Sequence, residues 1–321
     1  MKANKLALSA AACALWVLIL DSRTASRAAV SGIDVCIRTV IPSLFPFSLL
    51  SGYLTGNLQC GAWFASLFGC PKNCGSLLLT GFLGGYPMGA SLTAQQFHSG
   101  NLSKEEADRL IMFCSQAGPS FLFGITAVQL ESTHLGWFLW LIILLSSLSV
   151  AWLIPGNPHN FVKPNDPPKR TLTEAMTASI RAMSAVCGWV VMFNVLMTFL
   201  RKCFLWILPL EIQVLFSGLL ELTNGCLSLG SVENIRIRFL LAVIMLNFGG
   251  ICVWMQTASV AQGLSLRRYF LGKLLQTGFA VLYTLILMGY LWFLPFVFLI
   301  FFGRKLIKTR NSSSIPLKLG V

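Results

Sequence analysis

Long apolar runs alternate with short polar connectors along the whole chain. Five runs are predominantly apolar, and several exceed the roughly 18 residues that a helix needs to cross a bilayer; they cover 6–20, 33–56, 136–154, 175–200 and 274–303. Four more runs contain Gly, Pro or polar residues at their centre: 75–97, 103–129, 213–231 and 239–262. The pattern predicts an all-α polytopic protein that contacts the lipid bilayer and crosses a cell membrane several times.

The interrupted runs predict helices that break inside the membrane. The interruptions fall at 81–89, 116–120, 221–225 and 247–250, where glycines, prolines and amide side chains cluster. A broken helix exposes backbone N–H and C=O groups, which hydrocarbon tolerates only where protein or a polar cavity covers them. We therefore expect re-entrant hairpins over 75–97 and 213–231, and broken helices over 103–129 and 239–262.

The breaks recur in the second half of the chain at a slowly drifting offset. Thr80-Gly-Phe-Leu-Gly matches Ser217-Gly-Leu-Leu-Glu at 137 residues, and Gln116-Ala-Gly-Pro matches Asn247-Phe-Gly-Gly at 131. This favours two repeats, each reading helix, re-entrant hairpin, broken helix, helix. Each repeat then crosses the membrane three times, so the second is inverted relative to the first. Chance alignment of apolar segments is the alternative explanation.

These observations predict five regions. An N-terminal anchor or signal-like helix (1–29) precedes the first repeat (30–154), a proline-rich linker (155–173), the second repeat (174–303) and a basic tail (304–321). Whether residues 6–20 are cleaved stays open. Pro42 and Pro46 predict a kink or break in the run 33–56.

The charge balance is strongly basic, with 24 Lys and Arg against 11 Asp and Glu, a formal charge of +13. The basic residues stand in connectors and in the tail, beside apolar segments. That placement is typical of membrane topology and anionic head groups rather than of nucleic-acid binding. With the N-terminus inside, the bases 163–170 and 267–273 also fall inside, whereas the side on which the tail lies stays undetermined.

The sequence contains no pattern typical of catalysis. It lacks a nucleophilic triad, a phosphate-binding loop, a nucleotide fingerprint and paired carboxylates, so we expect no enzyme and no bound cofactor. Cys60, Cys70 and Cys74 form the one close cysteine cluster, but its spacing and the lack of a nearby histidine do not fit a metal site.

Two segments carry a resemblance to a known family. Gly81-Phe-Leu-Gly-Gly-Tyr-Pro-Met-Gly-Ala90 and Phe113-Cys-Ser-Gln-Ala-Gly-Pro-Ser120 resemble the YlbJ-type sporulation integral membrane proteins. Those proteins belong to the nucleoside-recognition, or gate, group, which is similar to the core of concentrative nucleoside transporters. The likeness covers about 30–262, so that both repeats are gate repeats, and it is sharpest over 77–124. Gly84 and Ser91 depart from the family pattern, which usually has Ser and a basic residue there.

The resemblance implies a role in sporulation, in the mother-cell or forespore membrane, with transport of dipicolinate toward the forespore. The residues themselves favour a transporter or permease for a small polar, anionic solute, because half-helix N-termini at mid-membrane attract negative groups. A nucleoside or another small solute is an alternative. A non-transporting scaffold of a sporulation complex is an alternative of another class, and homo-oligomerisation stays open.

We expect the four breaks to surround one cavity. The candidate substrate-binding residues are Gly84, Gly85, Tyr86, Pro87, Gly89, Ser115, Gln116, Ser120, Thr223, Asn224 and Asn247. For the glycines, close helix packing is the alternative role, and for Gln116 and Asn247 it is hydrogen bonding between helices.

Charged residues in apolar segments are the remaining candidates. Glu221 is a candidate for proton or sodium coupling, unless it is a solvated residue at a shallow hairpin tip. Arg38 and Arg181 face either an anionic substrate or lipid head groups, and we favour head groups because both residues stand near the start of their apolar runs.

Overall fold

The computed structural model describes residues 2–57, 61–156 and 171–289, and within these ranges the regular elements are all helices. Five of the helices are long and apolar enough to cross a membrane. Together with the composition, this identifies a multi-pass all-α membrane protein. Cys60, most of the proline-rich linker, the end of the last apolar run and the basic tail lie outside the described residues.

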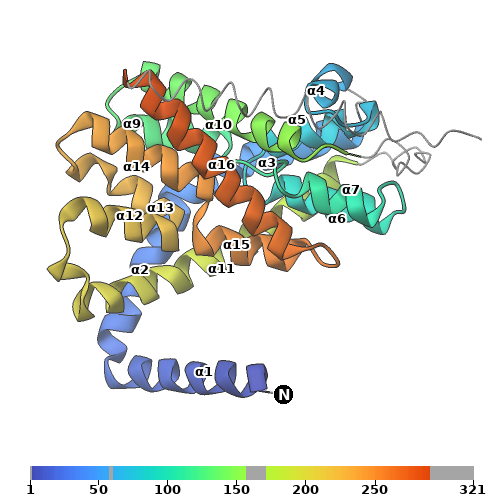
Figure 1. Cartoon of the computed structure of the whole chain (residues 1–321). Helices are drawn as coiled ribbons and strands as arrows, with labels where there is room; N and C mark the ends of the chain where they lie inside the picture. The colour runs from blue at the N-terminus through green and yellow to red at the C-terminus, as the bar shows by residue number, and fades with distance from the viewer. Residues whose placement is uncertain (1, 58–60, 157–170, 290–321) are drawn as a thin grey trace, which may run out of the picture.

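The first long helix begins earlier than expected. α1 (Lys2–Leu20) projects below the body of the protein (Figure 1), and Asp21 then caps α2 (Ser22–Val35) by accepting from the Thr24 N–H. A π-turn (Cys36–Val40) joins α2 to α3 (Ile41–Asn57) without a gap. The expected boundary at 29/30 therefore falls inside a continuous helix. The wide turn ends just before Pro42, whose missing N–H it accommodates.

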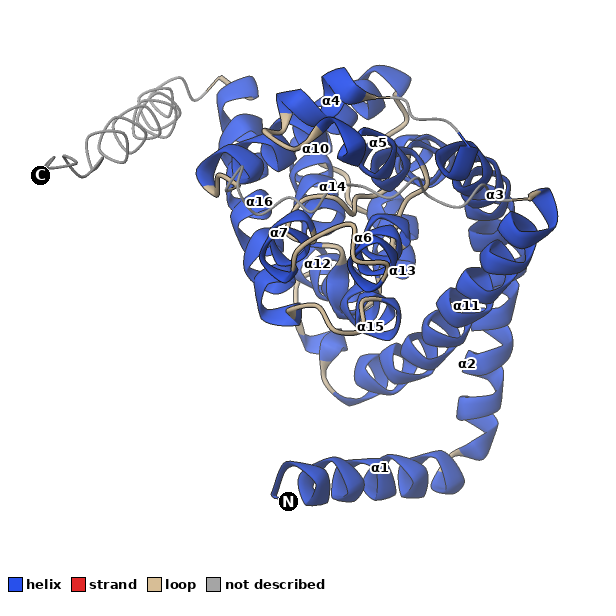
Figure 2. Ribbon diagram, turned by 90° about the vertical axis from the view of Figure 1, so that its right-hand side faces the viewer, coloured by secondary structure: helices blue, strands red, loops and turns tan. Residues whose placement is uncertain are grey.

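α11 (Leu172–Cys203) runs antiparallel to this helix, beside it (Figure 2). Asn194 donates to the Ala28 carbonyl at 2.7 Å near one end, and Ser48 donates to the Ser179 hydroxyl at 3.2 Å near the other. Gly32 lets the two backbones approach, because a Cβ there would stand 3.0 Å from the Val191 Cα. Small and polar residues of this kind are typical of helix contacts in membranes.

The expected breaks occur in both halves. α5 (Gly75–Leu83) ends at Gly84 and α6 (Met88–His98) follows, while α12 (Leu210–Leu220) ends at Glu221 and α13 (Leu222–Leu227) follows. The interrupted run 103–129 forms α7 (Lys104–Leu110), an irregular segment at 111–118, α8 (Pro119–Phe121), a π-turn (Leu122–Thr126) and α9 (Ala127–Gln129). Its counterpart gives α14 (Ile235–Phe248) and α15 (Gly250–Val260), separated by Gly249.

The break positions agree with the offsets read from the sequence. Gly84 and Glu221 are 137 residues apart, and the helix starts at Pro119 and Gly250 are 131 apart. Contacts agree as well. Gly81 lies against Gly89 and the Cys114 carbonyl, and in the second half Gly218 lies against Gly225 and the Met245 side chain. Both halves thus build the same three-way contact, while the inversion of the second repeat stays a prediction.

Three further helices complete the body. α4 (Ala62–Leu67) covers α5, and α10 (Thr133–Leu153) and α16 (Leu266–Leu287) pack against each other, with α14 packed against both. A buried ion pair fixes one end of this arrangement: Arg109 contacts Glu106 at 2.7 Å. The same guanidinium donates to the carbonyls of Phe68, Ala151 and Ile154, so it ties α7 to the ends of α4 and α10.

We predict that Gly81→Ala destabilises the protein by about 1–3 kcal/mol, because its Cβ would stand 1.9 Å from the Cys114 carbonyl oxygen. Thermal unfolding of the detergent-solubilised protein measures the change. Gly188→Ala on α11 is the control, since a Cβ there meets open space and alanine favours a helix by roughly 0.5–1 kcal/mol. Equal stability of the two variants would contradict the packing role of Gly81.

Candidate functional site

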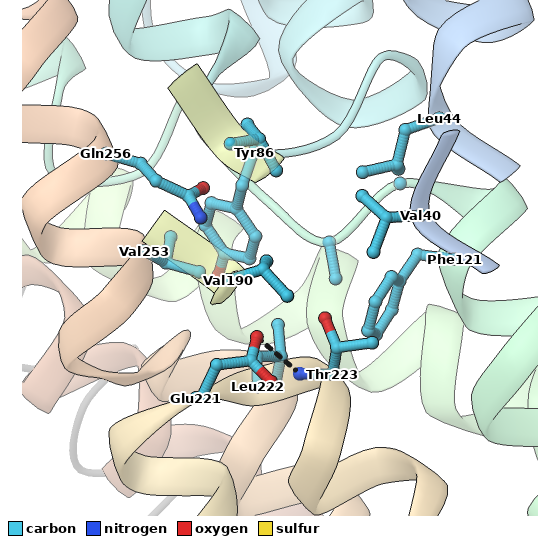
Figure 3. A pocket seen from close by; sticks show the side chains of 13 residues that line it. Val40, Leu44, Tyr86, Phe121, Val190, Glu221, Leu222, Thr223, Val253 and Gln256 are labelled. Atoms are coloured by element: carbon cyan, nitrogen blue, oxygen red, sulfur yellow. Dashed lines mark hydrogen bonds between the residues drawn. The ribbon is translucent and has the colours of Figure 1, made fainter. Parts of the chain in front are cut away.

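A pocket lies where the broken helices meet (Figure 3). Tyr86 comes from the first break, Gly118 from the second, and Glu221 and Thr223 from the third. α15, which begins at the fourth break, contributes Val253 and Gln256. The remaining lining is apolar: Val40, Leu44, Ala117, Phe121, Val186, Val190 and Leu222. A mostly apolar pocket with a few polar groups is the usual form of a small-molecule site.

Glu221 is an acid in the pocket wall. Its side chain is 2% exposed, so the interpretation as a solvated tip residue does not hold. The carboxylate accepts the N–H groups of Thr223 at 3.0 Å and Asn224 at 2.6 Å, and so caps α13. Within the described ranges no basic side chain pairs with it. Glu221 therefore replaces backbone partners lost at the break and also presents an acid to the pocket.

The sequence predicts that Lys273 lies in a polar connector. In the structure Lys273 is buried behind Tyr86. Lys273 is 1% exposed and stands in the second turn of α16. Its Nζ contacts the Ser115 carbonyl at 2.6 Å and the Tyr86 hydroxyl at 3.0 Å. The missed signal is Ser265, which caps α16 and sets its start at Leu266, so that Lys273 falls within the helix rather than before it.

Three amide side chains extend this cluster, Gln116 from the irregular segment at 111–118, Asn247 from α14 and Gln276 from α16. Gln116 and Gln276 exchange hydrogen bonds at 3.1 and 2.6 Å, and Gln276 also donates to Asn247 at 3.1 Å. Ser147 accepts from Gln116, and Ser146 donates to Asn247. Gln116 and Asn247 thus have the alternative role named in the sequence analysis, hydrogen bonding between segments of the fold. Neither side chain lines the pocket, and their hydrogen-bond network is connected to it only through Lys273 and Tyr86.

The other candidate residues lie in different places. Gly85 packs on Gly118 beside the pocket, and Pro87 precedes α6. Gly84 faces Ser51 of α3, whereas Gly89 is packed against the Cys114 carbonyl rather than on the pocket lining. Asn224 donates to Asn194 of α11 at 3.0 Å. The hydroxyls of Ser115 and Ser120 are buried without a hydrogen-bond partner in the described part of the chain.

Arg38 and Arg181 do not reach the pocket. Arg38 is exposed and pairs with Asp34 at 2.5 Å, and Arg181 is exposed on α11. The sequence predicts Arg38 near the start of its helix. Because that helix begins at Ser22, Arg38 lies near its middle instead. Neither arginine is therefore placed to contact a solute in this pocket.

The fold and the site define a class: a multi-pass helical membrane protein whose broken helices surround a pocket with an acid in its wall and a lysine behind it. Comparison with known proteins agrees with the resemblance seen in the sequence. The chain is similar to the sporulation integral membrane protein YlbJ of Bacillus subtilis (strain 168), with 25% identity over 322 residues, covering 84% of this chain and 79% of that protein. No protein-family model and no solved structure matches the chain.

We predict that Asn247→Leu destabilises the protein by about 1–3 kcal/mol, because Ser146 and Gln276 lose a buried acceptor. Thermal unfolding in detergent is the measurement. Asn73→Leu, at an exposed position, is the matched control and should change stability by less than about 0.5 kcal/mol. If Asn247→Leu unfolds like the native protein, Asn247 does not hold these helices together.

Proposed function

We propose that this protein is a transporter or permease for a small polar solute, and that the pocket between the four breaks is its binding site. The observation that supports this is the convergence of Tyr86, Gly118, Glu221 and Thr223 on one space. Secondary transporters place substrate and coupling ions where interrupted helices meet near mid-membrane. Helices that merely anchor a protein do not need such breaks, because each break removes backbone hydrogen bonds in hydrocarbon.

We propose an anionic solute of the dipicolinate type. The support is the likeness to a sporulation integral membrane protein and the family resemblance of the segments 81–90 and 113–120. On this proposal the protein acts in sporulation, in a mother-cell or forespore membrane. A nucleoside is the second candidate, which the resemblance to gate-type transporters favours.

A membrane scaffold is the rival of another class. In a scaffold, the pocket would be incidental and the exposed apolar faces would bind partner proteins. The polar groups around the pocket favour transport, since burying an acid and a lysine in a scaffold destabilises it without benefit.

Glu221 is the proposed coupling residue. It lines the pocket together with Tyr86 and is buried, and no basic side chain of the described ranges pairs with it. A buried carboxyl without a basic partner can exchange a proton or bind sodium as the pocket opens to each side.

We predict that the purified protein in liposomes takes up dipicolinate, and that Val190→Phe lowers the uptake rate at least about tenfold by filling the pocket. Met192→Phe is the matched control on the same helix, because Met192 is 58% exposed. Lack of uptake of dipicolinate, nucleosides and related acids by the native protein would favour the scaffold instead.

We predict that Glu221→Gln uncouples transport from its driving ion. The amide keeps one acceptor oxygen where the carboxylate has two, one each for the Thr223 and Asn224 N–H groups, and it cannot exchange a proton. Uptake should then lose its response to an imposed proton or sodium gradient while exchange of internal for external solute continues. Glu233→Gln, at an exposed position, should retain the response. A gradient response preserved in Glu221→Gln would exclude Glu221 as the coupling residue.

A further inference from the structure

Within the described part of the chain, Lys273 is a buried base without an acidic partner. Its Nζ lies within 3.2 Å of four oxygens, those of Ser115, Tyr86, Gln276 and Gln116, and all four belong to neutral groups. Among the described residues no carboxylate stands within ion-pair distance of it. Arg109, a buried base of the first half of the chain, has Glu106 at 2.7 Å. Lys273 thus differs from a base that is buried as part of a structural ion pair.

The geometry around Nζ identifies Lys273 as a donor to every neighbour. The Tyr86 hydroxyl donates its own hydrogen to the Leu246 carbonyl at 3.1 Å, so it accepts from Lys273. The Gln116 and Gln276 oxygens accept as well, because their amide nitrogens donate elsewhere. A site made only of acceptors suits an ammonium, which has three N–H donors and no lone pair.

One aromatic ring separates this ammonium from the pocket. The Tyr86 side chain lines the pocket, and Lys273 Nζ lies 4.9 Å from the centre of the same ring and 3.0 Å from its hydroxyl (Figure 3 shows Tyr86). Of the four oxygens around Nζ, the Tyr86 hydroxyl is the one that belongs to a residue of the pocket lining. A carboxylate is the stronger partner, since a charge-assisted hydrogen bond is roughly twice as strong as a neutral one.

We propose that Lys273 is the carboxylate-binding residue of the transport site, and that an entering solute carboxylate displaces the Tyr86 hydroxyl from it. This inference rests on the proposed transport function and narrows its substrate class to carboxylates. A neutral solute of the same shape cannot compensate the buried ammonium, so it gains nothing from releasing Tyr86. The pocket thereby selects for negative charge with a lysine that is covered until the solute arrives.

The test compares two solutes of matched shape on the full-length protein in liposomes: dipicolinate, and its uncharged diamide. We expect native protein to take up dipicolinate at least about tenfold faster than the diamide, which corresponds to about 1.4 kcal/mol of discrimination. Lys273→Met should lower dipicolinate uptake to the diamide level, and Lys273→Arg should restore part of it. Lys72→Met, which removes an exposed lysine, is the matched control and should behave like the native protein.

A second variant serves if Lys273→Met does not fold. Tyr86→Phe keeps the ring in the pocket wall and removes the competing hydroxyl, so dipicolinate should bind at least as tightly as to native protein, measured as a ligand-induced rise in unfolding temperature. Weaker binding by this variant, equal uptake of the two solutes by native protein, or unchanged uptake by folded Lys273→Met would each overturn the role of Lys273. In each of those cases the proposed transport function would still hold, provided that native protein takes up dipicolinate. No uptake of any solute by native protein would instead overturn the proposed function itself.

Discussion

The hydrogen bonding of the interrupted backbone is the constraint on which the rest of the structure depends. Each break frees N–H and C=O groups that hydrocarbon cannot satisfy. The carbonyl of Ser115 at the second break accepts from Lys273 of α16, and that of Leu246 at the fourth accepts from Tyr86 of the first. At the third break, Glu221 accepts two N–H groups itself. Two of these partners come from elsewhere in the fold, one from α16 and one from the first break, so those segments must pack beside the breaks that they satisfy.

Close approach at the breaks requires residues without a side chain. Gly81 and Gly89 meet the Cys114 carbonyl, and in the second half Gly218 and Gly225 meet the Met245 side chain. Gly249 and Gly250 adopt positive φ angles, 84° and 79°, which lets α15 restart directly after α14. The glycines are therefore packing and turn residues first, and the pocket is the space that remains between the segments they hold together.

Two of the buried bases, Arg109 and Lys273, illustrate how the same physics gives different roles. Arg109 has an acid partner and several carbonyl acceptors, so its charge is compensated within the fold and it ties helices together. Lys273 has carbonyl, hydroxyl and amide acceptors alone. A buried charge that has no ionic partner within the fold remains a strong binding site for an ion of opposite charge that enters from solution.

The sequence by itself determined the membrane class, the positions of the four breaks and the offsets between the halves, because apolar runs and clusters of Gly, Pro and amides act locally on a helix. It also identified Tyr86, Glu221 and Thr223, which line the pocket. Tertiary structure alone decided that Gly89 and Asn247 pack between segments and that Lys273 faces Tyr86. Those roles depend on which segments meet in the fold: Gly89 meets Cys114 25 residues away, Asn247 meets Gln276 29 residues away, and Lys273 meets Tyr86 187 residues away. Neither the start of α16 nor its neighbours follow from a run of apolar residues.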